Sequence, residues 1–290
     1  MSWRTVVINS RAKLTYKNGY LVVRGEDVHM VHLSEINTII INSTAVAITS
    51  YLVNELLSRK IKIVFCDEKR NPVGEVVSYY GCHNSSKRIH QQVEWDYEYA
   101  KTVWTAIIKE KIKNQAKLLR NYDEAGAEKL NKYIDQIRLY DVTNREGHAA
   151  KVYFDYLFGV EFTRSSKSDI NASLNYGYSI LLSQFNKEIV SNGYLTQLGI
   201  KHNNEFNPFN LTSDLMEPFR PLVDKIVREN CQEIFDGSMR LKLIDVLNHR
   251  VKIKNSNQYV SNAISIYVKS VIKAIENKDI EYLEFFDYEL

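Results

Sequence analysis

The stretch GIKHNNEFNPFNLTSDLMEPFRPLVD, from Gly199 to Asp224, changes along its length from a polar loop into a helical pattern. Its first half is rich in asparagine and contains a proline, and these residues favour neither a helix nor a strand. Apolar residues then recur at the spacing of one helical face: Leu215, Phe219, Leu222 and Ile226. This pattern predicts a helix that starts within the stretch and continues to about Asp236.

Two carboxylates stand three residues apart at the start of this predicted helix. Asp214 and Glu217 should therefore project from one side of it, and His202 on the preceding loop could close over them. One imidazole with carboxylate oxygens suits a hard divalent cation such as Mg²⁺ or Mn²⁺. Acidic residues in a first helical turn are also common, because they cap free N–H groups and complement the helix dipole. Spacing alone favours the capping explanation.

Composition places the chain among soluble globular proteins. Of its 290 residues, 44% are hydrophobic and 25% are charged, which allows one large domain or two moderate ones. No apolar run approaches the length of a membrane span and the first residues lack a signal peptide, so we expect a cytoplasmic protein without a membrane segment. The three widely spaced cysteines, Cys66, Cys82 and Cys231, indicate neither a disulfide framework nor a zinc site.

Charge is distributed unevenly along the chain. The net charge is +3, which is too small to argue for nucleic-acid binding. Residues 1–93 contain 12 Lys and Arg against 7 Asp and Glu, a net charge of +5, whereas residues 94–290 contain 26 against 28, a net charge of −2. Any surface that binds DNA must therefore consist of local basic patches.

The first eighty residues have the patterns of strands and turns. Residues 13–23 alternate apolar and polar side chains around Asn18-Gly19, which predicts a hairpin with a type I′ turn. Ser43 or Thr44 could cap a helix that continues to Leu57. Further strands are expected at residues 5–8, 27–32, 38–42, 61–66 and 75–80.

The remaining chain is expected to be helical after a connecting segment. Residues 81–94 begin with glycine, asparagine and serine and are interpreted as a linker, which could also contact DNA. Helices are expected at residues 96–120, 124–140, 143–158, 172–190, 235–246 and 259–275, and residues 250–254 should form a small hairpin or an extended loop. The predicted fold class is α+β, with a small β-rich N-terminal domain (residues 1–80) followed by a larger all-α C-terminal domain (residues 95–290).

A further carboxylate, Glu146, lies on the helix predicted for residues 143–158. Thr143-Asn-Arg-Glu146 is a capping-box pattern, and that pattern alone would explain the acid. Two features strain this explanation. Gly147 inside the helix costs about 1 kcal/mol relative to alanine, and Ala149 and Ala150 leave one side small. Small residues beside an acid let another helix approach closely, as the wall of a buried carboxylate site requires.

Three blocks in the chain resemble one known family. They are Asp214-Leu-Met-Glu217-Pro-Phe-Arg220-Pro with His202 upstream, Arg145-Glu146-Gly147-His-Ala149-Ala150-Lys-Val-Tyr153-Phe154, and Asn171-Ala-Ser-Leu174-Asn175-Tyr176-Gly177-Tyr178. The chain resembles the metal-dependent integrase/endonuclease of CRISPR spacer acquisition over essentially its whole length. Its N-terminus, Ser2-Trp3-Arg4-Thr5-Val-Val-Ile-Asn9, is similar to members from type II systems.

The resemblance implies a site and a reaction. Glu146, His202 and Glu217 would be the metal ligands and catalytic residues, with Asp214 beside them and Mg²⁺ or Mn²⁺ as the cofactor. Many relatives have aspartate where Glu217 stands. The implied reaction inserts a short foreign DNA fragment into a CRISPR array, as its 3′-hydroxyl attacks a phosphodiester at the edge of a repeat.

Supporting roles stay open at this stage. Arg220 could hold a scissile phosphate or pair with Glu217 or Asp224. Lys201 is a weaker phosphate candidate, and His202 could be a general acid instead of a ligand.

The resemblance also implies partners. They are double-stranded DNA (the fragment and the repeat), a second copy of the chain paired through the N-terminal domain, and a small CRISPR adaptation partner protein. An RNA-guided effector nuclease of the same system could assist fragment choice. Two alternatives remain: a general metal-dependent nuclease acting on branched or single-stranded DNA, and a non-catalytic DNA-binding scaffold whose acids are helix caps.

Overall fold

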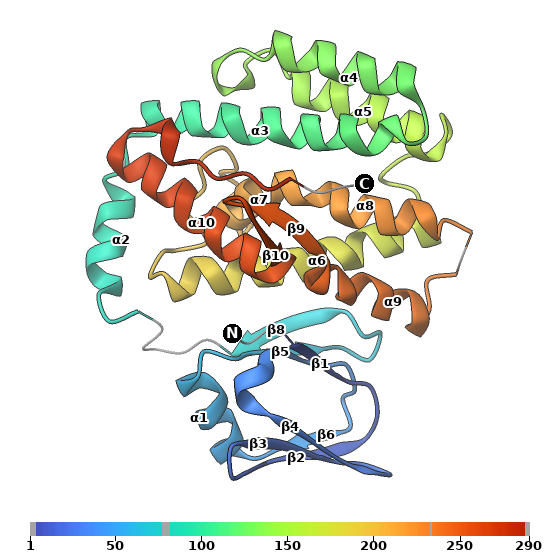
Figure 1. Ribbon diagram of the computed structural model, residues 1–290, viewed down its shortest axis with the longest axis vertical. Coiled ribbons are helices and arrows are strands. Elements are labelled where there is room, and N and C mark those ends of the chain that lie inside the picture. The colour runs from blue at the N-terminus through green and yellow to red at the C-terminus, as the bar shows by residue number, and fades with distance from the viewer. Residues whose placement is uncertain (1–3, 77–81, 233, 288–290) are drawn as a thin grey trace. The chain divides into compact units, whose positions relative to one another are not determined.

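The chain divides into two compact units. The structure, a computed structural model, describes residues 4–76, 82–232 and 234–287. One unit comprises Met1–Ser85 with Val190–Gly193, and the other comprises Ser86–Ile189 with Tyr194–Leu290. Strands dominate the N-terminal part and helices the C-terminal part (Figure 1), which confirms the predicted α+β class.

The first unit contains two four-stranded sheets. In one the strand order is β1-β5-β7-β8, with β1, β5 and β7 parallel and β8 antiparallel to β7. In the other the order is β4-β3-β2-β6, and β2 is parallel to β6 but antiparallel to β3. The strands are β1 (Arg4–Ile8), β2 (Ala12–Lys17), β3 (Tyr20–Arg24), β4 (Val28–His32), β5 (Ile36–Ile41), β6 (Val46–Ile48), β7 (Lys62–Cys66) and β8 (Pro72–Val76). A short 3₁₀ helix, η1 (Leu33–Glu35), leads into β5.

The predicted hairpin between β2 and β3 is confirmed. Lys17 pairs with Tyr20 across the turn, and both turn residues have positive φ, 48° at Asn18 and 86° at Gly19. A type I′ turn requires positive φ at both central positions, which asparagine and glycine tolerate. The expected strand at residues 75–80 is β8, and residues 77–80 of that prediction lie outside the described part of the chain.

The helix of this unit starts later than predicted. Neither Ser43 nor Thr44 caps it, because the following residues form β6 and pair with β2. Helix α1 (Ser50–Ser58) begins after Thr49, whose hydroxyl accepts a hydrogen bond from the Leu52 backbone. Leu52 and Leu56 are fully buried and join the core formed by the inward residues of the strands. Burial of this apolar surface is what stabilises so small a unit.

The segment interpreted as a linker contains a helix, α2 (Ser85–Val93). Its polar side chains make tertiary bonds that its composition does not reveal. Gln92 is fully buried, donates to the Leu195 carbonyl at 2.9 Å and accepts from the Leu195 amide at 2.8 Å. Arg88 pairs with Glu276 at 3.3 Å. These bonds hold α2 within the second unit and explain why a polar sequence is ordered as a helix.

The second unit is built around α3, which packs against α4, α5, η3, α8 and α10. Figure 1 shows α4 and α5 on one side of α3 and the other long helices of this unit on the opposite side. Its helices are α3 (Tyr97–Arg120), α4 (Glu124–Gln136), α5 (Arg145–Phe158), α6 (Asp169–Ser191), α7 (Asn210–Met216), α8 (Arg220–Glu229), α9 (Gly237–Ile244) and α10 (Val260–Asn277). Short 3₁₀ helices lie at η2 (Leu139–Asp141), η3 (Glu217–Phe219), η4 (Asp245–Asn248) and η5 (Ile280–Tyr282).

The prediction of one unbroken helix that continues to about Asp236 is wrong. The chain there forms α7, then η3, then α8, which ends at Glu229. Pro218 and Pro221 explain the break, because proline lacks the backbone N–H that an unbroken α-helix needs. Of the two possibilities left open for residues 250–254, the hairpin is found, as β9 (Arg250–Ile253) and β10 (Ser256–Tyr259). Among the described helices, none combines the length and apolar character needed to cross a membrane.

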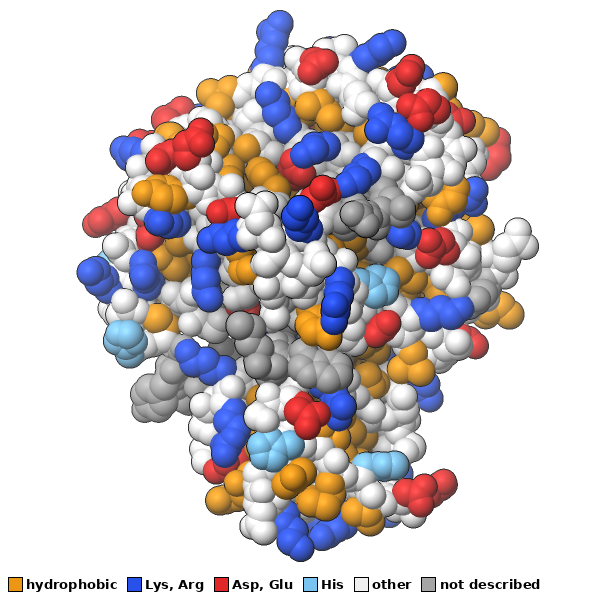
Figure 2. All heavy atoms as spheres, viewed as in Figure 1, with side chains coloured by type: hydrophobic (Ala, Val, Ile, Leu, Met, Phe, Trp, Pro, Cys, Tyr) orange, Lys and Arg blue, Asp and Glu red, His pale blue; other side chains and the backbone are white. Residues whose placement is uncertain are grey.

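Basic and acidic side chains are intermixed on the surface of the second unit. Figure 2 shows Lys and Arg side chains interspersed with Asp and Glu over the face in view. Some of these charges pair along a single helix, as Lys101 does with Glu98 at 2.6 Å. This face therefore carries small basic patches instead of one broad basic field, in agreement with the charge distribution along the sequence.

Candidate active site

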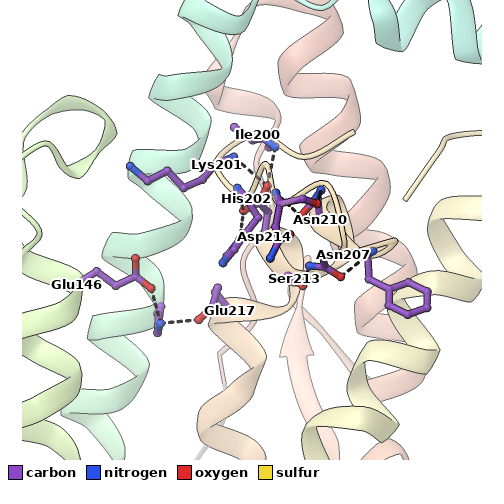
Figure 3. A network of polar contacts seen from close by, with 12 residues as sticks. Glu146, Ile200, Lys201, His202, Asn207, Asn210, Ser213, Asp214 and Glu217 are labelled. Carbon is purple, nitrogen blue, oxygen red and sulfur yellow. Dashed lines mark hydrogen bonds and ion pairs between the residues drawn. The ribbon is translucent and has the colours of Figure 1, made fainter. Parts of the chain in front are cut away.

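Glu146 and Glu217 meet at one lysine. The ammonium nitrogen of Lys111, on α3, lies 2.6 Å from Oε1 of Glu146 and 2.5 Å from Oε2 of Glu217. The two carboxylate oxygens therefore lie no farther apart than the sum of these distances. Figure 3 shows the two glutamates, from α5 and η3, pointing toward one another. The fold thus brings together two of the predicted site residues that lie far apart in the sequence.

Each glutamate is positioned by a neighbouring polar group. The Asp141 carboxylate accepts hydrogen bonds from the backbone amides of Arg145 at 2.8 Å and Glu146 at 2.9 Å, so Asp141 caps α5. The alternative of a capping box from Thr143 to Glu146 is wrong: the N-cap residue is Asn144, in the left-handed region, and Glu146 turns to Lys111 instead. Asn114 of α3 donates to the Pro218 carbonyl at 3.0 Å, which fixes η3 and Glu217 against α3.

Asp214 holds the loop that carries His202. Its fully buried carboxylate accepts from the backbone amides of Ile200 at 2.6 Å, Lys201 at 2.9 Å and His202 at 3.1 Å. The same carboxylate lies 2.6 Å from Nδ1 of His202 (Figure 3). Asp214 therefore does not cap its own helix. It fixes the imidazole through Nδ1, which leaves Nε2 as the ring atom available to a ligand or substrate.

The charges of the site act on one another. Burial alone would lower the pKa of Lys111, but the negative charges of Glu217 and Glu146 outweigh burial and raise it. Burial would raise the pKa of Glu217, but Arg220 and Lys111 lower it well below its usual value. The hydrogen bond to Asp214 raises the pKa of His202, and the charges of Glu217 and Glu146 raise it further. At neutral pH the site therefore holds an ionised Glu217 and a charged Lys111.

Arg220 pairs with Glu217 rather than with Asp224. Its Nε donates to Oε1 of Glu217 at 2.9 Å, and its guanidinium lies 4.6 Å from the centroid of the Tyr178 ring. Asp224 instead accepts from the hydroxyls of Tyr153, at 2.9 Å, and Tyr178. Of the two carboxylates considered as partners of Arg220, the structure shows the ion pair with Glu217.

Lys201 lies away from the carboxylate pair. Its ammonium donates to the Tyr140 carbonyl at 3.3 Å and lies 3.8 Å from the centroid of the Tyr140 ring. Its backbone amide donates to Asp214. The structure thus gives Lys201 a part in holding the loop.

The chemistry of these residues fits a divalent cation. A cationic group already stands between Glu146 and Glu217, and the two carboxylates carry the charge that Mg²⁺ or Mn²⁺ needs. Within the part of the chain that the structure describes, no three His, Cys, Asp or Glu side chains converge as a ready metal-binding cluster. Lys111 holds the two carboxylates and Asp214 engages the imidazole, so a bound ion would have to displace the ammonium.

The sequence interpretation missed Lys111 as a site residue. A lysine on a helix is usually exposed to solvent, yet the Lys111 side chain is only 10% exposed. A signal was present, because the inward positions Ile107 and Ile108 are followed at helical spacing by Lys111, Asn114 and Gln115, all buried. Three polar residues on an inward face indicate a buried polar site.

Comparison with known proteins gives the family. Residues 5–234 match the family described as CRISPR associated protein Cas1. A CRISPR-associated endonuclease Cas1 from Neisseria meningitidis serogroup C (strain 8013) is 32% identical over 295 residues, which cover 98% of this chain and 96% of that protein.

Two solved structures share the fold. A casposase bound to its integration product has a TM-score of 0.73 at 20% identity, over 96% of this chain and 92% of that one. A chain of a Cas6-RT-Cas1–Cas2 complex has a TM-score of 0.72 at 20% identity, over 97% of this chain and 36% of that one. The family match covers most of the chain and agrees with the resemblance seen in the sequence, so this chain belongs to the Cas1 family of CRISPR-associated proteins.

Proposed function

We propose that this chain is a metal-dependent DNA integrase and endonuclease that inserts short foreign DNA fragments into a CRISPR array. The observation that carries the proposal is the meeting of Glu146 and Glu217 at one cationic group. Two of the similar proteins support it: the Neisseria relative is named an endonuclease, and the casposase is bound to an integration product.

The proposed ligands are Glu146, Glu217 and Nε2 of His202, and the proposed ion is Mg²⁺ or Mn²⁺. When bound, such an ion offsets the negative charge of a phosphodiester and lowers the pKa of a coordinated hydroxyl. Asp214 keeps the imidazole oriented through Nδ1. The Arg220 guanidinium is held by Glu217 and Tyr178, and in the proposed complex its terminal nitrogens would donate to non-bridging phosphate oxygens.

The proposed reaction is a transesterification. A new P–O bond forms from the 3′-oxygen of the fragment to a phosphate at the edge of a repeat. The bond between that phosphate and the 3′-oxygen of the preceding nucleotide in the array breaks. The proton of the attacking hydroxyl passes to solvent or to this departing 3′-oxygen. One phosphodiester replaces another, so the step needs no external energy source and no covalent bond to the protein. With water in place of the hydroxyl, the same site would cleave DNA.

We further propose a cytoplasmic homodimer that acts on double-stranded DNA with a small adaptation partner protein. The complex that contains Cas1 and Cas2 supports a partner of this kind. An RNA-guided effector nuclease of the same system would assist in choosing fragments.

Strand transfer into a plasmid that carries a CRISPR repeat tests the proposal. The assay uses a labelled duplex fragment, Mn²⁺ and the partner protein. Glu146→Gln and Glu217→Gln should each reduce joined product by about 100-fold or more, because each removes a charged ligand while keeping the shape of the side chain. Glu128→Gln, at an exposed glutamate on α4, is the matched control and should transfer normally. Circular dichroism checks that each variant is folded.

The products separate the proposal from its alternatives. Branched molecules in which fragment and plasmid are joined support an integrase. Shortened strands without joined product would indicate a general nuclease. Normal transfer by both glutamine variants would remove the proposed site, and the absence of any thermal stabilisation by Mn²⁺ would favour a non-catalytic DNA-binding scaffold.

A further inference from the structure

We propose that Lys111 is a positioning residue whose ammonium holds the place of the divalent ion in the metal-free site and moves into a neighbouring cavity when the ion binds. The inference rests on the proposed function in one respect, that Glu146 and Glu217 are metal ligands. In this proposal the Lys111 side chain influences the metal affinity of the site and keeps Glu146 and Glu217 together when no metal is bound.

The first observation is the burial of this charge. The Lys111 side chain is 10% exposed, and the Glu217 side chain is 5% exposed. Burying a lone ammonium or a lone carboxylate is costly, and a buried charge persists only with a close partner of opposite sign. Lys111 forms ion pairs with two carboxylates from two other elements, η3 and α5. Without a cation between them, Glu146 and Glu217 would repel one another.

The second observation is that the ammonium and a divalent ion would need the same oxygens. Lys111 contacts Oε1 of Glu146 and Oε2 of Glu217 at 2.6 Å and 2.5 Å. Mg²⁺ binds carboxylate oxygens at about 2.0–2.1 Å. An ammonium that stayed in place would lie within a few ångströms of the ion and repel it strongly in a buried site. The two cations therefore exclude one another.

The third observation is a place for the displaced ammonium. A cavity of about 110 Å³ adjoins the site. Its polar lining comprises Lys111, Gln115, Tyr178, Glu217 and Asp224, together with the cationic side chains of Arg164 and Arg220. Gln115 lies one turn after Lys111 on the same face of α3, and side chains of a helix lean toward its N-terminus. Within the described residues, Oε1 of Gln115 is buried and has no hydrogen-bond partner. An ammonium that moved into the cavity could donate to this oxygen and approach the Asp224 carboxylate.

An unsatisfied buried acceptor is unfavourable, so the Gln115 oxygen favours the displaced position of the lysine. The ammonium would then contact the oxygens of Glu146 and Glu217 in the metal-free state, and those of Gln115 and Asp224 in the metal-bound state. The difference between these two sets contributes directly to the metal affinity.

The test compares Lys111→Met with the unaltered chain by Mn²⁺ titration, monitored by electron paramagnetic resonance, and by thermal unfolding. In EDTA the Lys111→Met variant should melt at a lower temperature, because two carboxylates lose their shared cation. It should bind Mn²⁺ about tenfold more tightly or better, because no ammonium has to leave. Mn²⁺ should therefore raise its melting temperature by more than that of the unaltered chain. Unchanged or weaker Mn²⁺ binding would overturn the proposal.

Two controls exclude simpler explanations. Lys109→Met removes an exposed lysine of the same helix, and it should leave both measurements unchanged. Lys111→Gln repeats the comparison with a polar side chain in case the methionine variant does not fold. A general loss of stability would not tighten metal binding. A lower melting temperature in EDTA together with a higher Mn²⁺ affinity is therefore specific to displacement.

The destination of the ammonium is tested with Gln115→Leu. As a single substitution, Gln115→Leu should weaken Mn²⁺ binding several-fold. Added to Lys111→Met, it should leave Mn²⁺ binding unchanged. Equal effects in both backgrounds would refute the proposed destination. Glu217→Gln separates the two proposals: if it binds Mn²⁺ as well as the unaltered chain does, the metal site itself is wrong and the role of Lys111 falls with it. If Glu217→Gln loses Mn²⁺ while Lys111→Met gains nothing, only the displacement is wrong.

Discussion

Asp214→Ala should destabilise the second unit and release the loop that carries His202. The fully buried carboxylate accepts three backbone hydrogen bonds, from Ile200, Lys201 and His202, and contacts the imidazole. A hydrogen bond to a charged group contributes about 1.5–3 kcal/mol, and removing the acceptor leaves its donors unpaired. The Ile200 residue is buried, whereas His202 can reach water, so part of the loss is recovered. We expect the free energy of unfolding to fall by about 3–5 kcal/mol.

Urea unfolding measures this loss, with the summed fluorescence of the three tryptophans, one of which is Trp104, as the probe. The Trp104 ring centroid lies 6.1 Å from that of His202, so its emission reports on the same neighbourhood. Asp135→Ala, at an exposed position of α4, is the control and should change stability by less than about 0.5 kcal/mol. A loss below about 1 kcal/mol for Asp214→Ala would refute the view that this carboxylate organises the loop. Strand transfer should also fall sharply in this variant, although Glu146 and Glu217 are intact.

Two further predictions concern the same region. Gly199→Ala should destabilise the loop by about 1–3 kcal/mol, because a Cβ there would lie 2.3 Å from the His202 carbonyl oxygen. The control is Gly74→Ala, where a Cβ would have no atom within 4 Å and should not perturb its surroundings by contact. Equal urea midpoints for the two variants would contradict this prediction. Burial raises the pKa of Asp224 to about 6 against the hydrogen bonds from Tyr178 and Tyr153. Because an unfolded aspartate titrates near 3.9, the folded chain binds more protons between about pH 4 and 6, and this carboxyl lowers the unfolding free energy as the pH rises through that window. Asp224→Asn should remove this dependence, so its stability relative to the unaltered chain should rise by up to about 3 kcal/mol from pH 4 to pH 7; a difference independent of pH in urea titrations would contradict the shift.

Local patterns predicted the elements whose conformation depends on nearby residues. The turn at Asn18-Gly19 and the start of α3 after Asp96 are both as expected, since the residues that determine them are adjacent in the sequence. The start of α1 was missed because residues 46–48 pair with β2, a contact distant in sequence. Helix α2 was missed because the partners of Arg88 and Gln92 lie more than a hundred residues away. Tertiary contacts of this kind override local propensity.

The site was predictable mainly through the family resemblance. Spacing could place Asp214 and Glu217 near one another, but it could not bring Glu146 to them, because that depends on how α5 packs on α3. Asp214 was expected beside the ligands, and the structure gives it the separate task of holding the His202 loop. Lys111 was missed because a lysine in a basic helix is usually solvated.

The most direct test of the proposed metal site is anomalous X-ray scattering from crystals of the chain soaked in Mn²⁺. We predict one strong peak between the carboxylates of Glu146 and Glu217, with Nε2 of His202 as a third protein ligand and the Lys111 ammonium displaced from its contact with the two glutamates. A peak that leaves out both glutamates, or Lys111 still bridging them in crystals where Mn²⁺ is bound elsewhere, would contradict the proposed site.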